Sequence, residues 1–189
     1  MSDEREQLIY YLRIQYNNGV PNEGMEEQNE YIDMIKKIIE LNPVLSEDEK
    51  VLLSLVYKNA VTLRRNAIRE VETHLQDPSN NNKPARQQKL FEYLTILKSE
   101  LKDICLDLIN LIKDTLLPQT YAGEQRVFYA KMQGDYYRYI CENKGEDVSE
   151  YITKASQCYD EALAIAKNEL SPTSSTYLGV VLNYSVFSI

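Results

Sequence analysis

The amino-acid sequence predicts an all-α fold, an antiparallel array of helices, and three observations lead to that prediction. Glycine and proline are scarce, with six residues of each among 189. The long stretches between them repeat their apolar residues every three or four positions, which is the period of a helix packed on one face. No segment alternates apolar and polar residues between hairpin turns, as a half-exposed strand would.

Breakers and caps divide the chain into seven expected helices joined by short loops. Ser46, with Glu49 three residues later, is a capping-box pattern, so a long helix is expected to begin there. It should end at the polar loop of residues 77–84, and Asn17-Asn18-Gly19 should end the first helix. The remaining helices are expected at residues 3–16, 25–41, 86–116, 124–143 and 148–169, and from Ser171-Pro172-Thr173 to the end of the chain.

The charge balance limits the classes of partner. The formal net charge is −8, from 29 acidic and 21 basic residues. Non-specific nucleic-acid binding needs a broad basic surface, which this balance does not favour. The first residues lack the apolar core of a signal peptide, and no later segment is apolar over the roughly 18 residues of a membrane span. We therefore expect a soluble cytoplasmic protein with no nucleic-acid or membrane partner.

The sequence contains few residues of the types that metal binding and acyl transfer require, with three cysteines and one histidine. Cys105, Cys141 and Cys158 are widely spaced, form no C-x-x-C pair and lie in apolar helical patterns. We interpret them as reduced core thiols. His74 is the only histidine, so neither a histidine-based metal site nor a Ser-His-Asp triad is expected. No cofactor is expected.

Three cations share one side of the expected helix that follows Ser46. Steps of seven and four residues bring Lys58, Arg65 and Arg69 within roughly 20° of one line. Val61 and Thr62 lie between them, so no carboxylate falls on the stripe between these cations. Clustered cations repel each other, and this pattern favours an anion-binding site.

A second polar stripe lies on the expected helix of residues 124–143. Lys131, Asp135, Arg138 and Glu142 follow at steps of four, three and four, with Tyr139 beside them. By spacing alone, this is typical of a solvated face with ordinary ion pairs.

Taken together, the two stripes favour a phosphate site. If both helices line one groove, Lys58, Arg65 and Arg138 can converge with the Tyr139 hydroxyl on one anion. Asp135 and Glu142 would hold the cations in place when the site is empty. Two guanidiniums, an ammonium and a phenol suit a tetrahedral dianion such as phosphoserine or phosphothreonine.

Four segments closely resemble sequences of the 14-3-3 protein family. They are residues 53–59 (LSLVYKN) followed by Arg64-Arg65, residues 100–105 (ELKDIC), residues 127–139 (VFYAKMQGDYYRY) and residues 182–187 (LNYSVF). They occur in the family's order and near its spacing. The resemblance covers about residues 26–189.

The resemblance implies a helical adaptor that binds phosphoserine or phosphothreonine peptides of client proteins in a concave groove and has no catalytic activity. The family's phosphate ligands correspond to Lys58, Arg65, Arg138 and Tyr139. Its other groove positions correspond to Arg69, Lys131, Gly179, Leu182, Asn183 and Val186. Among these, Asn183 is expected to hydrogen-bond the peptide backbone.

The chain departs from the family at its ends and at single positions. Family members have nine helices, so the last two, which complete the apolar wall of the groove, are expected to be missing. The 14-3-3-like domain is then residues 25–189, after a divergent helix and linker at residues 1–24. Gln133 replaces a lysine of the family, and Ile68 replaces a tryptophan.

The resemblance also implies a dimer face, which corresponds to Glu30, Tyr31, Asp33, Tyr93, Ile96 and Glu100. Glu30 stands where a basic residue is usual, so its pair with Glu100 of a second copy becomes like-charged. Ile96 stands where a lysine would pair with Asp33. Surface ion pairs contribute only about 0–1 kcal/mol each, so we expect a weakened or rearranged homodimer rather than none.

Two other functions compete with the phosphopeptide adaptor. The first is a phosphate-independent helical scaffold, which the incomplete groove and altered dimer face favour. The second is an enzyme that uses Asp135 and Glu142 as an acid–base pair. No nucleophile, Gly-rich phosphate loop or metal cluster accompanies these two carboxyls in the sequence, so an enzyme is not expected.

Overall fold

The structure, a computed structural model, describes residues 3–17, 24–80, 83–121, 123–143 and 147–187. Over these residues it contains seven α-helices and no strand, which confirms the all-α prediction. The chain divides into two compact units, Met1–Ile104 and Cys105–Ile189. Residues 18–23, in the expected linker after the first helix, lie outside the described part.

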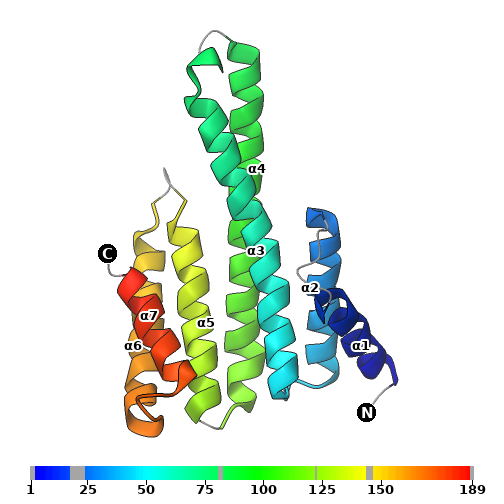
Figure 1. The fold of residues 1–189 in the computed structure, drawn as a ribbon, viewed down its shortest axis with the longest axis vertical. Helices are drawn as coiled ribbons and strands as arrows, with labels where there is room; N and C mark the ends of the chain where they lie inside the picture. Colours follow the sequence, from blue (N-terminus) through cyan, green and yellow to red (C-terminus); the bar gives the residue numbers. More distant parts are fainter. Residues whose placement is uncertain (1–2, 18–23, 81–82, 122, 144–146, 188–189) are drawn as a thin grey trace. The chain divides into compact units, whose positions relative to one another are not determined.

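The first unit contains α1 (Asp3–Asn17), α2 (Met25–Leu41), α3 (Glu47–Gln76) and most of α4 (Pro84–Leu111), with a short 3₁₀ turn at Pro78–Asn80. The observed α2 has the predicted bounds, and α1 is one residue longer than predicted. In Figure 1, α1 crosses α2, and it packs against both α2 and α3. The apolar sides of these three helices form the core, with Leu12, Ile35, Ile38, Leu53 and Val56 at 0% exposure.

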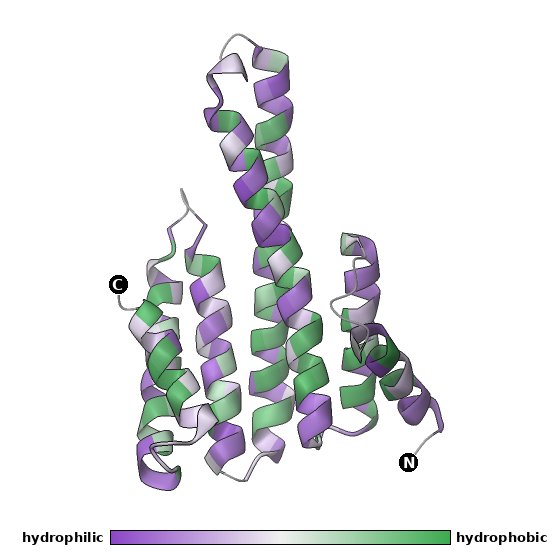
Figure 2. Cartoon of the chain, viewed as in Figure 1, coloured by the Kyte–Doolittle hydropathy of each residue, from purple (hydrophilic) through white to green (hydrophobic). Residues whose placement is uncertain are grey.

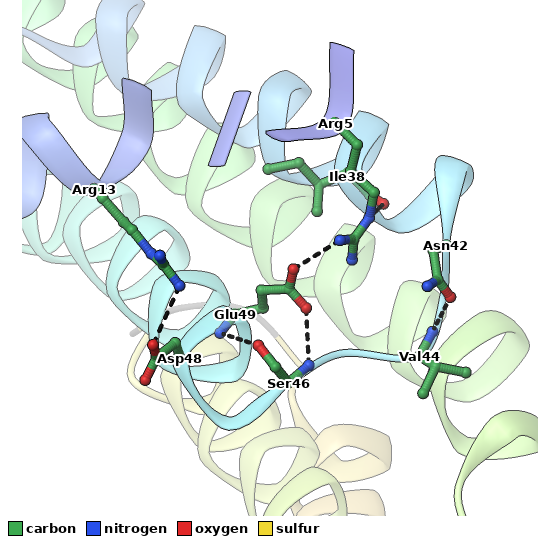
Figure 3. A network of polar contacts seen from close by, with 8 residues as sticks. All are labelled: Arg5, Arg13, Ile38, Asn42, Val44, Ser46, Asp48 and Glu49. Atoms are coloured by element: carbon green, nitrogen blue, oxygen red, sulfur yellow. Dashed lines mark hydrogen bonds and ion pairs between the residues drawn. The ribbon is translucent and has the colours of Figure 1, made fainter. Parts of the chain in front are cut away.

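The predicted capping box is present at the start of α3. The Ser46 N–H donates to Glu49 Oε2 (2.8 Å), and the Glu49 N–H donates to Ser46 Oγ (3.4 Å). Glu49 also accepts a hydrogen bond at Oε1 from Arg5 Nη1 (2.8 Å), while Arg5 Nε donates to the Ile38 carbonyl (3.2 Å). Figure 3 shows how this network ties α1 to α2 and to the first turn of α3.

A buried arginine joins α3 to α2 and α4. Arg64 is 1% exposed, and its guanidinium makes three hydrogen bonds. Its Nε donates to Glu100 Oε2 (3.0 Å), Nη2 donates to Asn29 Oδ1 (2.9 Å), and Nη1 donates to the Ala60 carbonyl (3.1 Å). A buried arginine is tolerated when its donors are paired in this way.

The second unit contains the end of α4, α5 (Gly123–Cys141), α6 (Ser149–Glu169) and α7 (Ser175–Phe187). The fourth helix was expected over residues 86–116, and helical backbone is observed from Pro84 to Leu116. Proline suits the first turn of a helix, where the backbone N–H that it lacks would have no helical partner. The α-helical part ends at Leu111. A π-helix (Ile112–Leu116) and a 3₁₀ turn (Leu117–Gln119) follow, the latter containing Pro118.

The predicted start of the last helix at Ser171 is wrong. Residues 171–174 form a turn closed by the Ser174 N–H on the Ser171 carbonyl (2.9 Å), and α7 begins at Ser175. The hydroxyl of Ser174 accepts from the Tyr177 N–H (3.5 Å), as an N-cap residue does. The predictions for α5 and α6 differ from the observed bounds by one or two residues.

Small side chains allow α5, α6 and α7 to pack closely. Their shared core contains Val127, Ala130, Ala162, Ala166 and Val180. Much of α7 is apolar, as its green colour in Figure 2 shows. Only Val180 on this helix is buried, whereas Leu178, Val181, Leu182 and Val186 are exposed. Among the described helices, none combines the length and the apolar character that a membrane span requires.

Candidate functional site

The cation stripe of Lys58, Arg65 and Arg69 lies on the middle of α3, in the first unit. Lys58 and Arg69 are exposed, and Arg65 is half-buried. Val61, between them in sequence, is only 1% exposed, so the stripe borders the buried side of the helix. Because Lys58 and Arg69 are exposed, an anion in solution can reach both of them.

The two neighbouring arginines of α3 have different surroundings. Arg64 is buried and holds α2, α3 and α4 together, whereas Arg65 lies on the half-exposed stripe. Consecutive helical residues point about 100° apart, so one arginine can serve the core while the next faces outward. The sequence pattern singled out Arg65, and the structural role of Arg64 was missed.

The polar stripe of α5, in the second unit, contains two ion pairs spaced four residues apart. Lys131 Nζ lies 2.7 Å from Asp135 Oδ2, and Arg138 Nη1 lies 3.3 Å from Glu142 Oε1. The first pair is the more buried, with side-chain exposures of 25% and 10%. Each acid of the stripe therefore contacts one of its cations.

Asp135 also connects α5 to the two helices that follow. Its Oδ1 accepts hydrogen bonds from the Tyr159 hydroxyl on α6 (2.6 Å) and from Asn183 Nδ2 on α7 (2.7 Å). Asp135 and Tyr159 are buried, and Asn183 is half-buried. Sequence reasoning placed Asp135 and Asn183 in the site but missed Tyr159, whose only sequence signal is its place on the apolar side of α6.

The guanidinium of Arg138 is held in an aromatic setting. Its Cζ lies 4.6 Å from the centroid of the Tyr139 ring, a cation–π arrangement. Burial would lower the pKa of Arg138, but the hydrogen bond with Tyr159 and the charge of Asp135 outweigh burial and raise it. Its Nε is buried and has no hydrogen-bond partner among the described residues. The side chain therefore stays charged and keeps a donor unused.

A cavity of about 540 Å³ lies beside Arg138. Its other lining residues are Cys141, Glu142, Ile152, Val186 and Phe187, from α5, α6 and α7. Ile152 and Val186 are about half exposed, at 46% and 54%. The cavity thus joins an apolar surface to the charged end of α5.

The expected groove residues of the second unit lie on α5 and α7, and two of those on α7, Gly179 and Asn183, lie close to α5. Gly179 is close to Lys131, because a Cβ at Gly179 would lie 3.4 Å from Lys131 Cε. Leu182 and Val186 are exposed on α7, on either side of Asn183 in sequence. Arg69, the remaining expected groove residue, lies on α3 in the first unit.

The two halves of the expected phosphate site therefore lie in different units. Lys58 and Arg65 belong to the first, and Arg138 and Tyr139 belong to the second. Within the second unit, Arg138 and Tyr139 are in contact. The convergence of all four residues on one anion stays a prediction.

The expected dimer-face residues are all in the first unit. Glu30, Asp33, Tyr93 and Ile96 are exposed. Tyr31 is only 3% exposed, because it packs against Tyr16 of α1 with ring centroids 5.9 Å apart. Glu100 is half-buried and already accepts a hydrogen bond from Arg64 of its own chain.

The pKa values of Cys141 and Cys158 are raised, which disfavours the thiolate that nucleophilic and metal chemistry need. None of the three cysteines forms a disulfide with another described residue, and Cys105 is buried. Burial raises the pKa of Cys158 to about 11 and also raises that of Cys141, with Glu142 adding to the second effect. In the part of the chain that the structure describes, no three His, Cys, Asp or Glu side chains are grouped as metal ligands.

Comparisons with known proteins agree on one family. The family model described as "14-3-3 protein" matches residues 22–189. The "14-3-3-like protein 2" of Caenorhabditis elegans is 39% identical over 191 residues, which cover 99% of this chain and 72% of that protein. The "14-3-3 protein beta/alpha" of Xenopus tropicalis is 42% identical over 166 residues, covering 86% and 67%. The "14-3-3 protein 9" of Solanum lycopersicum is 36% identical over 187 residues, covering 98% and 69%.

Proposed function

The chain belongs to the 14-3-3 family, and we propose that it is an adaptor for phosphorylated client proteins. Family membership supports a protein-binding role. In the proposal, the chain binds phosphoserine or phosphothreonine segments and thereby changes a client's location, activity or assembly. It acts in the cytoplasm, in signal transduction, without catalysing a reaction.

The state of Arg138 is the observation that carries the proposal. This arginine is held against Tyr139 and contacts Glu142 through a 3.3 Å hydrogen bond, longer than a strong charge-assisted one. A phosphoryl group brings about −1.5 to −2 charges and three acceptor oxygens, so it can displace the single carboxylate. The exposed Glu142 can then turn into solvent.

Lys58 and Arg65 complete the proposed phosphate site from α3. The proposal requires the two units to bring these cations to the same anion as Arg138 and the Tyr139 hydroxyl. Four such donors match the geometry and charge of a dianion better than those of a carboxylate. Arg69, Lys131, Gly179, Leu182, Asn183 and Val186 would then contact the peptide on either side of the phosphate.

A peptide array tests the proposal directly. Each serine-centred peptide is printed in a phosphorylated and an unphosphorylated copy, and the best pair is then measured in solution by fluorescence anisotropy. We expect tight binding of the phosphorylated copy alone. Equal binding of both copies would instead support a phosphate-independent scaffold and would contradict the proposal.

Charge reversals locate the site. Arg65→Glu and Arg138→Glu should abolish binding of the phosphorylated peptide and leave helicity, measured by circular dichroism, unchanged. Arg126→Glu is the matched control, since Arg126 is a half-exposed cation of the same helix as Arg138 and forms a long ion pair with Glu161 at 3.8 Å. Retained affinity in both site variants would refute the assigned site.

A further inference from the structure

We propose that Tyr159 is a positioning residue for peptide binding: its buried hydroxyl holds the Asp135 carboxylate, which in turn fixes the side-chain amide of Asn183. This inference rests on the proposed function, because it names the residue that orients one part of the same site. It concerns only α5, α6 and α7, which belong to one unit.

The Asp135 carboxylate is held from three directions. Lys131 donates to Oδ2 (2.7 Å), and Tyr159 and Asn183 both donate to Oδ1, at 2.6 and 2.7 Å. The donors come from α5, α6 and α7 respectively. With both oxygens engaged and only 7% of the residue exposed, the carboxylate has one position in which all three hydrogen bonds form.

The protonation of Tyr159 fixes the direction of the hydrogen bonds. Burial raises the pKa of the Tyr159 hydroxyl, and the neighbouring Asp135 carboxylate raises it further; together they outweigh the hydrogen bond with Arg138, which lowers it. The hydroxyl therefore remains a neutral donor at physiological pH. Since an ionised carboxylate only accepts, Asn183 must present its Nδ2 and not its Oδ1 to Asp135.

The orientation of the Asn183 amide has a consequence for a ligand. With one Nδ2–H committed to Asp135, the amide retains Oδ1 and its second N–H for other partners. One acceptor and one donor side by side match the N–H and C=O groups of an extended peptide. Asn183 is half-buried between the exposed Leu182 and Val186, so a peptide on α7 can reach it.

Ring packing holds Tyr159 in place independently of its hydroxyl. The ring stacks on Tyr184 with centroids 5.2 Å apart and an interplanar angle of 16°, and it lies 5.7 Å from the ring of Phe187. Gly134 of α5 leaves room for it, because a Cβ at that position would lie 2.9 Å from the Tyr159 ring. A phenylalanine can therefore fill the same space without the hydroxyl.

Tyr159→Phe and Tyr184→Phe form a matched pair for the test. Both remove one hydroxyl from the same ring stack, but the Tyr184 hydroxyl donates to the exposed Asp160 (2.8 Å) and not to Asp135. We expect Tyr159→Phe to weaken binding of the array-selected phosphopeptide about fivefold to twentyfold, the effect of one or two lost hydrogen bonds. Tyr184→Phe should bind within about twofold of the unaltered protein.

A mutant cycle distinguishes positioning from general loosening. If Tyr159 acts through Asn183, Tyr159→Phe should add little to the loss caused by Asn183→Ala. The side-chain ¹⁵N–¹H resonances of Asn183 should also shift in Tyr159→Phe and not in Tyr184→Phe, without any peptide present. Additive losses together with unchanged Asn183 resonances would overturn the inference.

These measurements distinguish a failure of the proposed function from a failure of the inference about Tyr159. If the unaltered protein binds no phosphopeptide, the proposed function fails, while the Asn183 resonances still report whether Tyr159 orients the amide. Should Tyr159→Phe not fold, Asp135→Asn tests the same link without changing the aromatic rings. The amide that replaces the carboxylate can both donate and accept hydrogen bonds, so it no longer forces Asn183 to present its Nδ2. Unchanged affinity in folded Asp135→Asn would overturn the inference.

Discussion

Arg64 donates a hydrogen bond from its Nε to Oε2 of Glu100 across 3.0 Å, which joins α3 to α4 inside one chain. The arginine is 1% exposed, and the Glu100 side chain is 43% exposed. Glu100 was expected on the dimer face, opposite Glu30 of a second copy. Its charge is therefore partly compensated within its own subunit, which lessens the like-charge repulsion expected there.

Substitutions of Arg64 and Arg65, the two neighbouring arginines of α3, should have different effects: the first on stability and the second on phosphopeptide binding. Arg64→Met is expected to lower the free energy of unfolding by about 2–4 kcal/mol, since three hydrogen bonds are lost but Glu100 stays partly hydrated. Arg65→Met should change it by less than about 1 kcal/mol and weaken phosphopeptide binding about thirtyfold or more. Urea unfolding and anisotropy titration measure the two effects. Equal loss of stability in both variants would contradict the assignment.

The buried Arg5–Glu49 pair should contribute far more to stability than the exposed pair beside it. Arg5→Met leaves Glu49 buried without its cation, and we expect a loss of about 3–5 kcal/mol in urea unfolding. Arg13→Met is the control, because Arg13 contacts Asp48 on the same turn of α3 (Figure 3), and these two side chains are 44% and 79% exposed. It should cost less than about 1 kcal/mol. Similar losses in the two variants would show that the burial of the first pair is unimportant.

The stability difference due to Arg5 should depend on pH. Burial would raise the pKa of Glu49, but the hydrogen bonds from Arg5 and Ser46 outweigh burial and hold it below the ordinary 4.5. The pair's contribution is therefore complete above pH 4.5 and is lost as the pH falls through the lowered pKa. The gap in unfolding free energy between the unaltered protein and Arg5→Met should narrow in acid. If the difference in unfolding free energy stayed constant until Glu49 is fully protonated, the contribution of Arg5 would come from packing and not from its charge.

Gly134 and Gly179 should respond oppositely to alanine. At Gly134 an added Cβ would lie 2.9–3.0 Å from the packed Tyr159 ring, so we expect a loss of about 1–3 kcal/mol. At Gly179 the nearest atom is Lys131 Cε at 3.4 Å, on a flexible side chain. There the better helix propensity of alanine should stabilise by up to about 1 kcal/mol. Thermal melts of the two variants check the contrast, and a stable Gly134→Ala would show that α5 and α6 are not closely packed.

Restoring a basic residue on α2 should strengthen the expected homodimer. Glu30→Arg would replace repulsion of Glu100 in a second copy with attraction, and we expect the dimer dissociation constant to fall by up to roughly tenfold. The change should shrink at high salt, where exposed charges are screened. Glu40→Arg, an exposed position on the same helix, is the control. Sedimentation velocity measures both, and a tight dimer of the unaltered protein at low micromolar concentration would contradict the weakened interface.

Local chemistry explains which elements could be predicted. The bounds of α2 and the Ser46 cap of α3 depend on residues close in sequence, and both are observed as predicted. The start of α7 was wrong, and the π-helical and 3₁₀ turns after Leu111 were not predicted. A proline limits a helix without fixing whether the last turns are α, π or 3₁₀, and Ser171 and Ser174 are both possible caps until the turn between them is known.

The sequence by itself determined the helical class, the two polar stripes and the family, because helical period and short motifs are properties of neighbouring residues. The α5 ion pairs follow from a spacing of four residues. Only the tertiary structure decided that Arg64 is buried while Arg65 is not, and that Tyr159 reaches Asp135 from 24 positions away. Those roles depend on which helices pack together, and packing is a property of residues distant along the chain.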